Sequence, residues 1–227
     1  MRQPDHLRAI LREVRRAVTI PLTLKVRSGW DEGSRNAMDI AVMAEEEGVE
    51  ALAIHGRTRA QLYRGEADWD VVEQIADRLS IPVLGSGDVV DRRSAEQRLR
   101  GKVAGLFIGR ASMWNPYVFS EIMTGEPSKL RDNPGLMLDL LFRYIELLKE
   151  DFSDSTAVGK VKQLASQMCR GAVWRKTLLT INTLQGQVEL LERVRAGEWS
   201  LPSITRLDPA DDEISSGELS CNSFSSV

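Results

Sequence analysis

Ala51-Leu-Ala-Ile-His-Gly-Arg-Thr58 is the stretch that reveals the fold of this chain. Four consecutive apolar residues without helical spacing are typical of a short buried strand, and His55 stands at its end. A Gly-Arg-Thr turn follows at once. Many α/β enzymes present their chemistry on a buried strand that ends on a titratable side chain and then turns on glycine. A single histidine in this position is also commonly a structural residue, so the other strands must be considered.

Three further strands are expected at 22–27, 82–85 and 104–108, and helices at 4–17, 35–47, 68–79 and 94–100. The strand ends at Arg27, His55, Gly85 and Ile108 are 28, 30 and 23 residues apart. This is the period of repeated βα units, and the nearly continuous apolar strands favour a parallel sheet covered on both faces. An open doubly wound sheet and a closed (βα)₈ barrel both fit this spacing.

The strand pattern is lost from about residue 134 onward. Helices are expected at 136–149, 158–170 and 188–195, which indicates a second, all-helical module. Its segment 156–196 is basic, with seven Lys and Arg against two Glu, whereas residues 197–227 carry six acids and one Arg. The acidic tail has few periodic apolar residues and is expected to be disordered.

The composition is that of a soluble protein, with 42% apolar and 28% charged residues among 227. No run approaches the ~18 apolar residues of a membrane span, and no secretory signal is found, so a cytoplasmic protein is expected. Cys169 and Cys221 lack the spacing of a disulfide framework or a zinc site, and no metal site is predicted.

The strand ends carry the candidate chemistry. Lys25 lies in an apolar strand, where a lysine either reaches solvent or contacts an electron-rich ligand atom. Short glycine-containing turns follow the last two strands, at 85–88 and at Gly109-Arg110. Their backbone N–H groups and the charge of Arg110 can bind an anion. Together these features indicate a phosphorylated ligand with a polar head reached by Lys25 and His55.

The chain resembles the tRNA-dihydrouridine synthases. The resemblance is carried, in order, by Leu24-Lys25-Val-Arg27-Ser-Gly-Trp30-Asp31, His55-Gly-Arg-Thr58, Gly85-Ser-Gly87-Asp88, Gly109-Arg110 and Asn115-Pro116. It is close over residues 4–125 and looser to about 196.

The resemblance implies an FMN-containing (βα)₈ barrel with a helical domain that helps to hold tRNA. In this family reduced FMN delivers hydride to uridine, a cysteine acid adds a proton, and NADPH regenerates the flavin. Lys25 and His55 would contact the flavin, and Ser86, Gly87, Asp88, Gly109 and Arg110 would hold its phosphate. Arg57 and the basic cluster of the helical module would contact RNA; this cluster is Lys160, Lys162, Arg170, Arg175 and Lys176.

Two departures from the family pattern stand out. Ser86 replaces an asparagine of the family. The four strands correspond to the last four of the barrel, so the loop that carries the cysteine acid is expected upstream of Met1. The predicted organisation is therefore the C-terminal half of a barrel at 1–125, a helical tRNA-binding domain at 126–196 and the acidic tail at 197–227. A half-barrel has exposed strand edges, so self-association or pairing with a complementary barrel half is expected.

Two other functions remain open from the residues alone. One is another oxidoreductase barrel that binds FMN or a phosphate and does not act on RNA. The other is a non-catalytic RNA-binding remnant, which would not bind flavin. The basic helical segment favours RNA, although such a segment is often only a solvated face.

Overall fold

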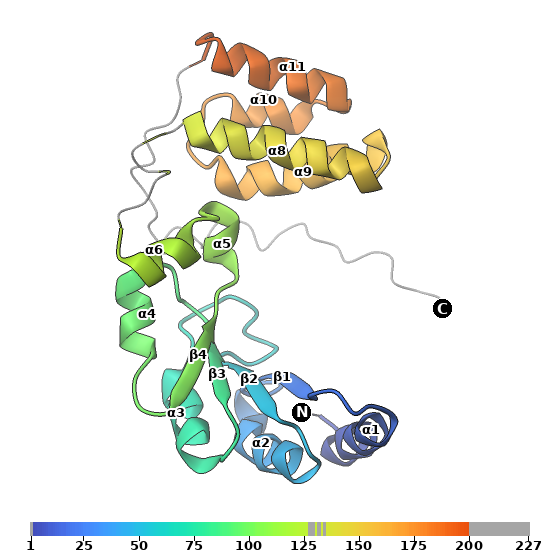
Figure 1. Cartoon of the computed structure of the whole chain (residues 1–227), viewed down its shortest axis with the longest axis vertical. Helices are drawn as coiled ribbons and strands as arrows, with labels where there is room; N and C mark the ends of the chain where they lie inside the picture. Colours follow the sequence, from blue (N-terminus) through green and yellow to red (C-terminus); the bar gives the residue numbers. More distant parts are fainter. Residues whose placement is uncertain (1, 127–129, 131–132, 134, 200–227) are drawn as a thin grey trace.

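The computed structural model describes residues 2–126, 130, 133 and 135–199. Figure 1 shows a curved sheet with helices along its outer side and, beyond it, a separate group of helices. No helix among the described residues is long and apolar enough to cross a membrane.

The four strands form one parallel sheet in the order of the sequence. They are β1 (Thr23–Arg27), β2 (Ala51–His55), β3 (Val83–Ser86) and β4 (Val103–Phe107). The register pairs Arg27 with His55, His55 with Ser86, and Ser86 with Phe107. The repeated βα units predicted from the strand spacing are confirmed. Because all strands run in one direction, the four side chains at their carboxyl ends lie in one row.

The helices that precede and connect the strands cover one face of the sheet. They are α1 (Pro4–Ala17), α2 (Ala37–Glu46), α3 (Trp69–Arg78) and α4 (Arg92–Arg98), with a 3₁₀ turn, η1 (Glu32–Ser34), after β1. Leu52 and Ile54 pack against Val72 and Ile75 in the core between sheet and helices. The side chain of Asp68 accepts a hydrogen bond from the Val71 N–H and begins α3, as expected of an N-cap.

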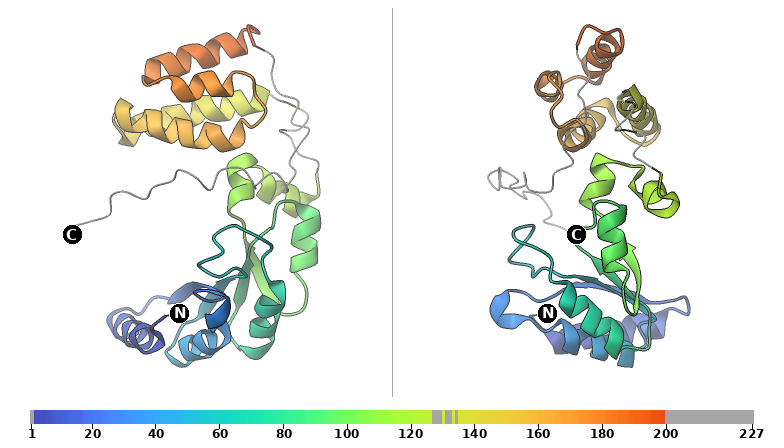
Figure 2. Two further views of the ribbon diagram at one scale, coloured as in Figure 1. Left: turned by 180° about the vertical axis from the view of Figure 1, so that it is seen from behind. Right: turned by 90° about the vertical axis from the view of Figure 1, so that its left-hand side faces the viewer.

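The expectation that both faces of the sheet are covered fails at the edge strands β1 and β4, whereas the three middle residues of β2 are buried. Along β1, the apolar Leu24 and Val26 alternate with the more polar Thr23 and Lys25, which are exposed. Phe107 on β4 is also exposed, at 45% of its surface. Figures 1 and 2 show that the sheet curls around this open face, which is therefore concave. The alternation in β1 reflects one face against helices and one face left open.

Two short helices lead from the sheet to the helical module. These are α5 (Arg110–Trp114) and α6 (Val118–Thr124), and the module itself comprises α8 (Gly135–Asp151), α9 (Asp154–Met168), α10 (Arg175–Thr180) and α11 (Leu184–Arg195). The module has its own core, in which Leu141, Val161, Trp174 and Leu191 are completely buried. The part of the predicted acidic tail from residue 200 onward lies outside the described residues.

The predicted starts of two of these helices are wrong. Both α9 and α11 begin four residues before the predicted positions, because their first turns are polar and carry little of the apolar pattern. Thr183 caps α11 by accepting a hydrogen bond from the Gly186 N–H. Helix α10 was not predicted, since six residues are too few to show a helical period.

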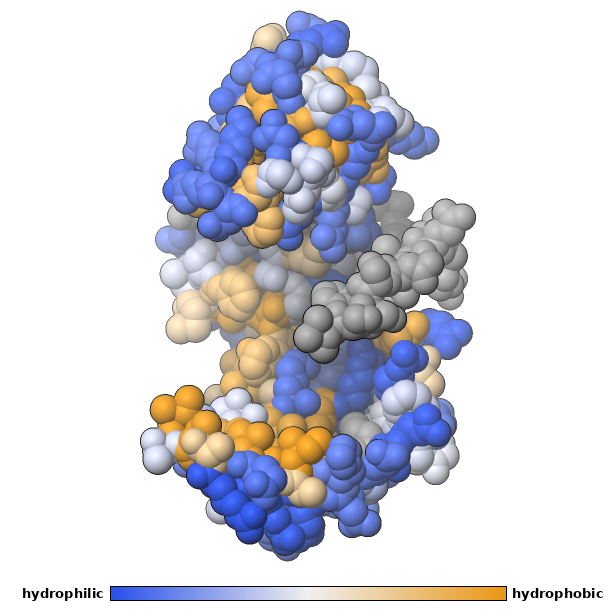
Figure 3. Space-filling model, turned by 90° about the vertical axis from the view of Figure 1, so that its right-hand side faces the viewer, coloured by the Kyte–Doolittle hydropathy of each residue, from blue (hydrophilic) through white to orange (hydrophobic). Residues whose placement is uncertain are grey.

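The module meets the sheet-containing part through α5 and α9. The Trp114 Nε1–H donates to Gln167 Oε1 at 3.3 Å, and the Arg170 guanidinium lies 5.5 Å from the centre of the Trp114 ring. Figure 3 shows the module with a mainly hydrophilic surface, while apolar residues gather on the sheet-containing half below it. On this face the two parts thus differ in surface character as well as in architecture.

Candidate functional site at the strand ends

Lys25 lies on the concave face of the sheet. Its Nζ is 5.8 Å from the ring centre of Phe107, which belongs to β4 at the opposite edge. Two strands separate β1 from β4, so it is the curl of the sheet that brings these two edges together. Partial burial and the neighbouring charge of Arg27 lower the pKa of Lys25. The face therefore presents an ammonium group beside an exposed aromatic ring.

His55 stands at the centre of the row of strand ends. Burial and the charges of Arg27, Lys25 and Arg57 lower its pKa to about 4, so the imidazole is neutral at pH 7. Its Nε2 is buried and has no hydrogen-bond partner among the described residues. A neutral ring with a nitrogen that lacks a partner is suited to contact a polar ligand atom.

We expect the His55 imidazole to titrate near pH 4, below the usual histidine range. Since the folded-state pKa is lowered, the unfolded chain binds the proton more readily between pH 6.5 and 4. The contribution of His55 to stability is therefore present above about pH 6.5 and is lost as the pH falls toward 4. Proton NMR of the imidazole resonances measures this pKa, and the variant His55→Gln assigns the signal. A midpoint at 6 or above would contradict the described environment.

Gly87 allows the turn after β3 to approach His55 closely. Its φ of +121° is a conformation open to glycine, and an added Cβ would lie 2.5 Å from the Cβ of Ala67 and 3.4 Å from His55 Nε2. Ser86, directly before it, is 8% exposed, and its backbone carbonyl accepts a hydrogen bond from the Gly56 N–H. The glycine in this turn is thus explained by close packing.

Asp88 is bonded to protein groups on several sides. Its carboxylate receives both terminal nitrogens of Arg57, at 2.8 and 2.9 Å, and the backbone N–H of Ala67 at 2.7 Å. Arg110 Nη2 donates to the same carboxylate at 3.2 Å. Burial alone would raise the pKa of Asp88, but these hydrogen bonds and charges outweigh it and hold the pKa below its usual value.

Arg57, for which contact with RNA is expected, is bonded to protein groups in this arrangement. Its side chain is buried, with 2% of its surface exposed. Besides Asp88, it donates to the backbone carbonyls of Arg64 and Gly65 in the loop after β2. The sequence could not show this, because the guanidinium folds back onto its own loop and onto a residue 31 positions away.

The loop at 56–68 also receives Arg27, a contact that sequence reasoning did not find. Arg27 Nη1 donates to the carbonyls of Thr58 and Leu62, both at 2.9 Å. The exposed Tyr63 of this loop lies under the Arg110 guanidinium, which is 4.9 Å from the ring centre. The alternation of Lys25 and Arg27 along β1 signalled a shared face, whereas nothing in the sequence singled out Tyr63.

Gly109 and Arg110 follow β4 and begin α5. An added Cβ at Gly109 would meet no atom within 4 Å, so a ligand has room to approach the backbone there. Arg110 keeps 28% of its side-chain surface exposed. The structure thus brings Lys25, His55, Ser86, Gly87, Asp88, Gly109 and Arg110 to one end of the sheet.

The members of the predicted basic cluster differ in their exposure and in their contacts. Lys162 donates to Asn182, Lys160 lies over the Phe152 ring, and Arg175 donates to the Ser166 carbonyl. Arg170 and Lys176 are the exposed members of the cluster. Cys169 is completely buried in the core of the module, and burial raises the pKa of its thiol to about 12.

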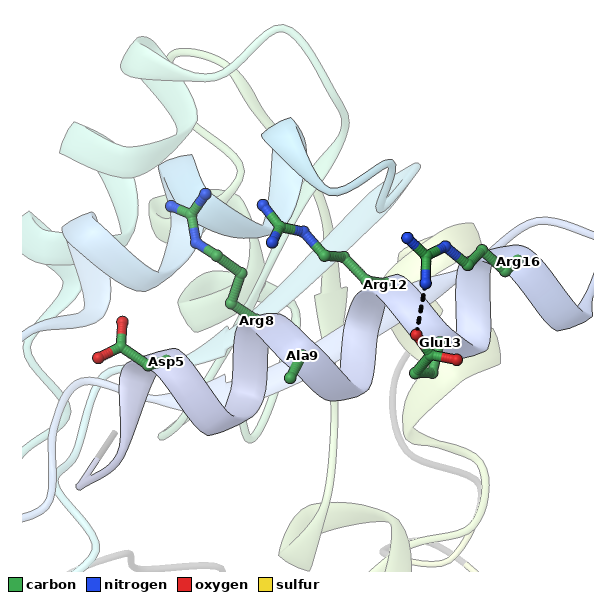
Figure 4. A pocket seen from close by; sticks show the side chains of 6 residues that line it. All are labelled: Asp5, Arg8, Ala9, Arg12, Glu13 and Arg16. Carbon is green, nitrogen blue, oxygen red and sulfur yellow. Dashed lines mark hydrogen bonds and ion pairs between the residues drawn. The ribbon is translucent and has the colours of Figure 1, made fainter.

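One surface hollow lies away from the strand ends. It is lined only by residues of α1, namely Asp5, Arg8, Ala9, Arg12, Glu13 and Arg16 (Figure 4). Arg8 and Arg12 form ion pairs with Glu47 of the segment after α2, and Arg16 pairs with Glu13. These charges hold α1 against its neighbour and offer little to a ligand. The described residues also contain no group of three or more His, Cys, Asp or Glu side chains placed to bind a metal.

Comparison with known proteins gives consistent matches. The family model for dihydrouridine synthase matches residues 1–198. The tRNA-dihydrouridine synthase B of Klebsiella pneumoniae is 44% identical over 131 residues, which cover 56% of this chain and 41% of that protein. The tRNA-dihydrouridine synthase B of Vibrio cholerae is 33% identical over 200 residues, covering 85% and 62%.

The extent of these matches limits what they imply. This chain spans 41% of the Klebsiella protein and 62% of the Vibrio protein, so it corresponds to part of each relative. The family model nevertheless matches most of the chain, including every strand end described above. The chain therefore belongs to the dihydrouridine synthase family.

Proposed function

We propose that the protein containing this chain reduces uridine to 5,6-dihydrouridine in tRNA with bound FMN. In this proposal the chain supplies one wall of the FMN site. The observation that carries it is the concave sheet end, where Lys25, the neutral His55 and Arg110 gather in a chain of the dihydrouridine synthase family. Membership of the family supports the reaction, and the arrangement of these residues supports the place.

The residues at the strand ends fit an anionic, aromatic ligand such as FMN. Lys25, Arg27 and Arg110 provide positive charge, and Phe107 provides an exposed ring beside Lys25. The buried His55 Nε2 lacks a partner that a flavin oxygen or nitrogen could supply. The open space at Gly109 leaves room for the phosphate. The wall formed by this chain therefore matches both ends of the cofactor.

Each residue has a distinct part in this proposal. FMN, when bound, supplies hydride chemistry, with NADPH as the proposed reductant. Lys25 places a positive charge where negative charge gathers on a reduced ring. His55 orients the ligand through a hydrogen bond, and its pKa of about 4 makes it neutral at pH 7 before the ligand binds. Ser86, Gly87 and Gly109 shape the turns that the phosphate approaches.

The described residues place no cysteine thiol at this site that could protonate uridine. The thiol of Cys169 is buried in the helical module, and burial raises its pKa to about 12. We propose that a cysteine outside this chain provides the proton, on a complementary barrel half that also covers the concave face. The cytoplasm, where tRNA is modified, is the proposed location.

Flavin binding tests this proposal directly. The purified chain is titrated with FMN, and quenching of flavin fluorescence reports binding. Saturable binding that is weakened by Lys25→Ala supports the site. A chain that binds tRNA but remains colourless and does not quench FMN would instead favour a non-catalytic RNA-binding module. A chain that binds FMN but does not bind tRNA would favour an oxidoreductase that does not act on RNA.

We expect the exposed basic residues of the helical module to bind tRNA phosphates. Neutralising Arg170 and Lys176 together should lower the dependence of log Kd on log salt by about one unit of slope for each lost contact. The two are chosen because they are the exposed members of the cluster. Filter binding between 50 and 200 mM salt measures the slope.

Lys149→Gln at the end of α8 is the matched control, since it removes one exposed charge outside the cluster. An unchanged slope for the double variant would assign Arg170 and Lys176 to a solvated face.

A further inference from the structure

We propose that Asp88 is a positioning residue that fixes Arg110 for phosphate binding and locks the loop after β2. This inference rests on the proposed function. It differs from the prediction that Asp88 itself holds the phosphate. A carboxylate held in the charged form repels a phosphate, so Asp88 must have a role other than direct phosphate binding.

The contacts of Asp88 define this role. Arg57 holds the carboxylate by a hydrogen bond from Nη2 to Oδ2 at 2.9 Å and an ion pair between Nη1 and Oδ1 at 2.8 Å. The same guanidinium reaches the carbonyls of Arg64 and Gly65, and Asp88 Oδ2 accepts from the Ala67 N–H. One acidic side chain in the turn after β3 thereby fastens both ends of the loop at 57–67.

Arg110 is the residue of this group that binds the phosphate in this proposal. Its Nη2 bonds to Asp88 Oδ1, and its guanidinium lies 4.9 Å from the ring centre of Tyr63, which the fastened loop carries. The Arg110 side chain is 28% exposed, whereas the Arg57 side chain is 3% exposed. With one carboxylate between two guanidinium groups, the cluster keeps a net positive charge, and the exposed share of that charge belongs to Arg110.

The backbone supports the same role. Asp88 has a φ of +55°, in the left-handed region that Asp and Asn adopt more readily than other side chains. Asn at this position is therefore compatible with the backbone, and Asp88→Asn removes the charge with little change of shape.

The test compares FMN with riboflavin, which has the same ring system and no phosphate. The ratio of the riboflavin dissociation constant to the FMN dissociation constant isolates the contribution of the phosphate. This ratio does not depend on the fraction of folded protein. Asp88→Asn should weaken FMN binding about tenfold, because a charged hydrogen bond that orients Arg110 is lost. Riboflavin binding should stay within about twofold, since the ring contacts Lys25 and His55 in the proposed site.

Other roles predict different results. If Asp88 were only a nearby negative charge, its removal would tighten FMN binding. If it were only a structural residue, FMN and riboflavin would weaken equally. Arg57→Lys keeps the positive charge and removes the paired contact of the guanidinium with both carboxylate oxygens of Asp88. It should therefore lower the ratio of the riboflavin to the FMN dissociation constant less than Asp88→Asn does. Asp77→Asn, the same change at an exposed site on α3, is the control and should leave the ratio unchanged.

The outcomes separate this inference from the proposed function. A wild-type chain that prefers FMN, with an Asp88→Asn variant that keeps the full preference, overturns the positioning role alone. A wild-type chain that binds neither flavin overturns the proposed function and, with it, this inference. A reduced preference confined to Asp88→Asn and, more weakly, Arg57→Lys supports it.

Discussion

Replacing Lys25 with alanine is expected to lower uridine reduction roughly 100-fold or more in a protein that contains this chain within a complete barrel, as loss of one preorganised charge at a reacting group does. The ammonium lies on the concave face beside Phe107, where the proposed flavin ring would bind. The change should alter the free energy of unfolding by less than about 0.5 kcal/mol, because Lys25 is exposed and fills no core space.

Single-turnover reduction of tRNA and urea unfolding, measured on the same preparations, check both parts of this prediction. Lys102→Ala is the matched control, since Lys102 is exposed at the opposite end of β4, and its contact is with the Asp77 carbonyl. Unchanged turnover of Lys25→Ala would remove Lys25 from the flavin site.

Trp69→Ala should cause the largest loss of stability among single substitutions near the site, about 3–5 kcal/mol. The ring is 3% exposed and fills the space above Gly85, where an added Cβ would lie 2.2 Å from Trp69 Cζ3. Its Nε1–H also donates to the Gly87 carbonyl at 3.1 Å. The substitution therefore opens a cavity beneath β3 and frees the turn that approaches His55.

Urea unfolding followed by far-ultraviolet circular dichroism measures this loss. Trp30→Ala is the comparison, because Trp30 is only half-buried and is flanked by the Arg2 and Arg59 side chains. A loss below about 1 kcal/mol for Trp69→Ala would show that the ring does not fill the core as described.

The sheet was largely readable from the sequence because its signals are local. Residues 51–55 form β2 as predicted, and the other three strands begin and end within one residue of their expected limits. Apolar runs punctuated by Gly and Pro are set by neighbouring residues, and their spacing implies parallel strands. The candidate residues followed, since parallel strands place their carboxyl ends at one edge.

The helical module was harder to read for the same physical reason. Its long helices carry apolar patterns, but the largely polar first turns of α9 and α11 carry little of them, and α10 is too short to show a period. Capping groups such as Thr183 act through hydrogen bonds that a pattern of apolar residues does not reveal.

The sequence by itself determined the parallel βα order, the family and the set of charged residues at the strand ends. Only the tertiary structure decided what those charges do. It buried Arg57 against Asp88, left Arg110 partly exposed above Tyr63 and brought Lys25 to Phe107 across the curl of the sheet. The reason is that burial and ion pairing depend on contacts between residues far apart in the chain, such as Arg57 and Asp88, whereas strand and helix signals arise between neighbours.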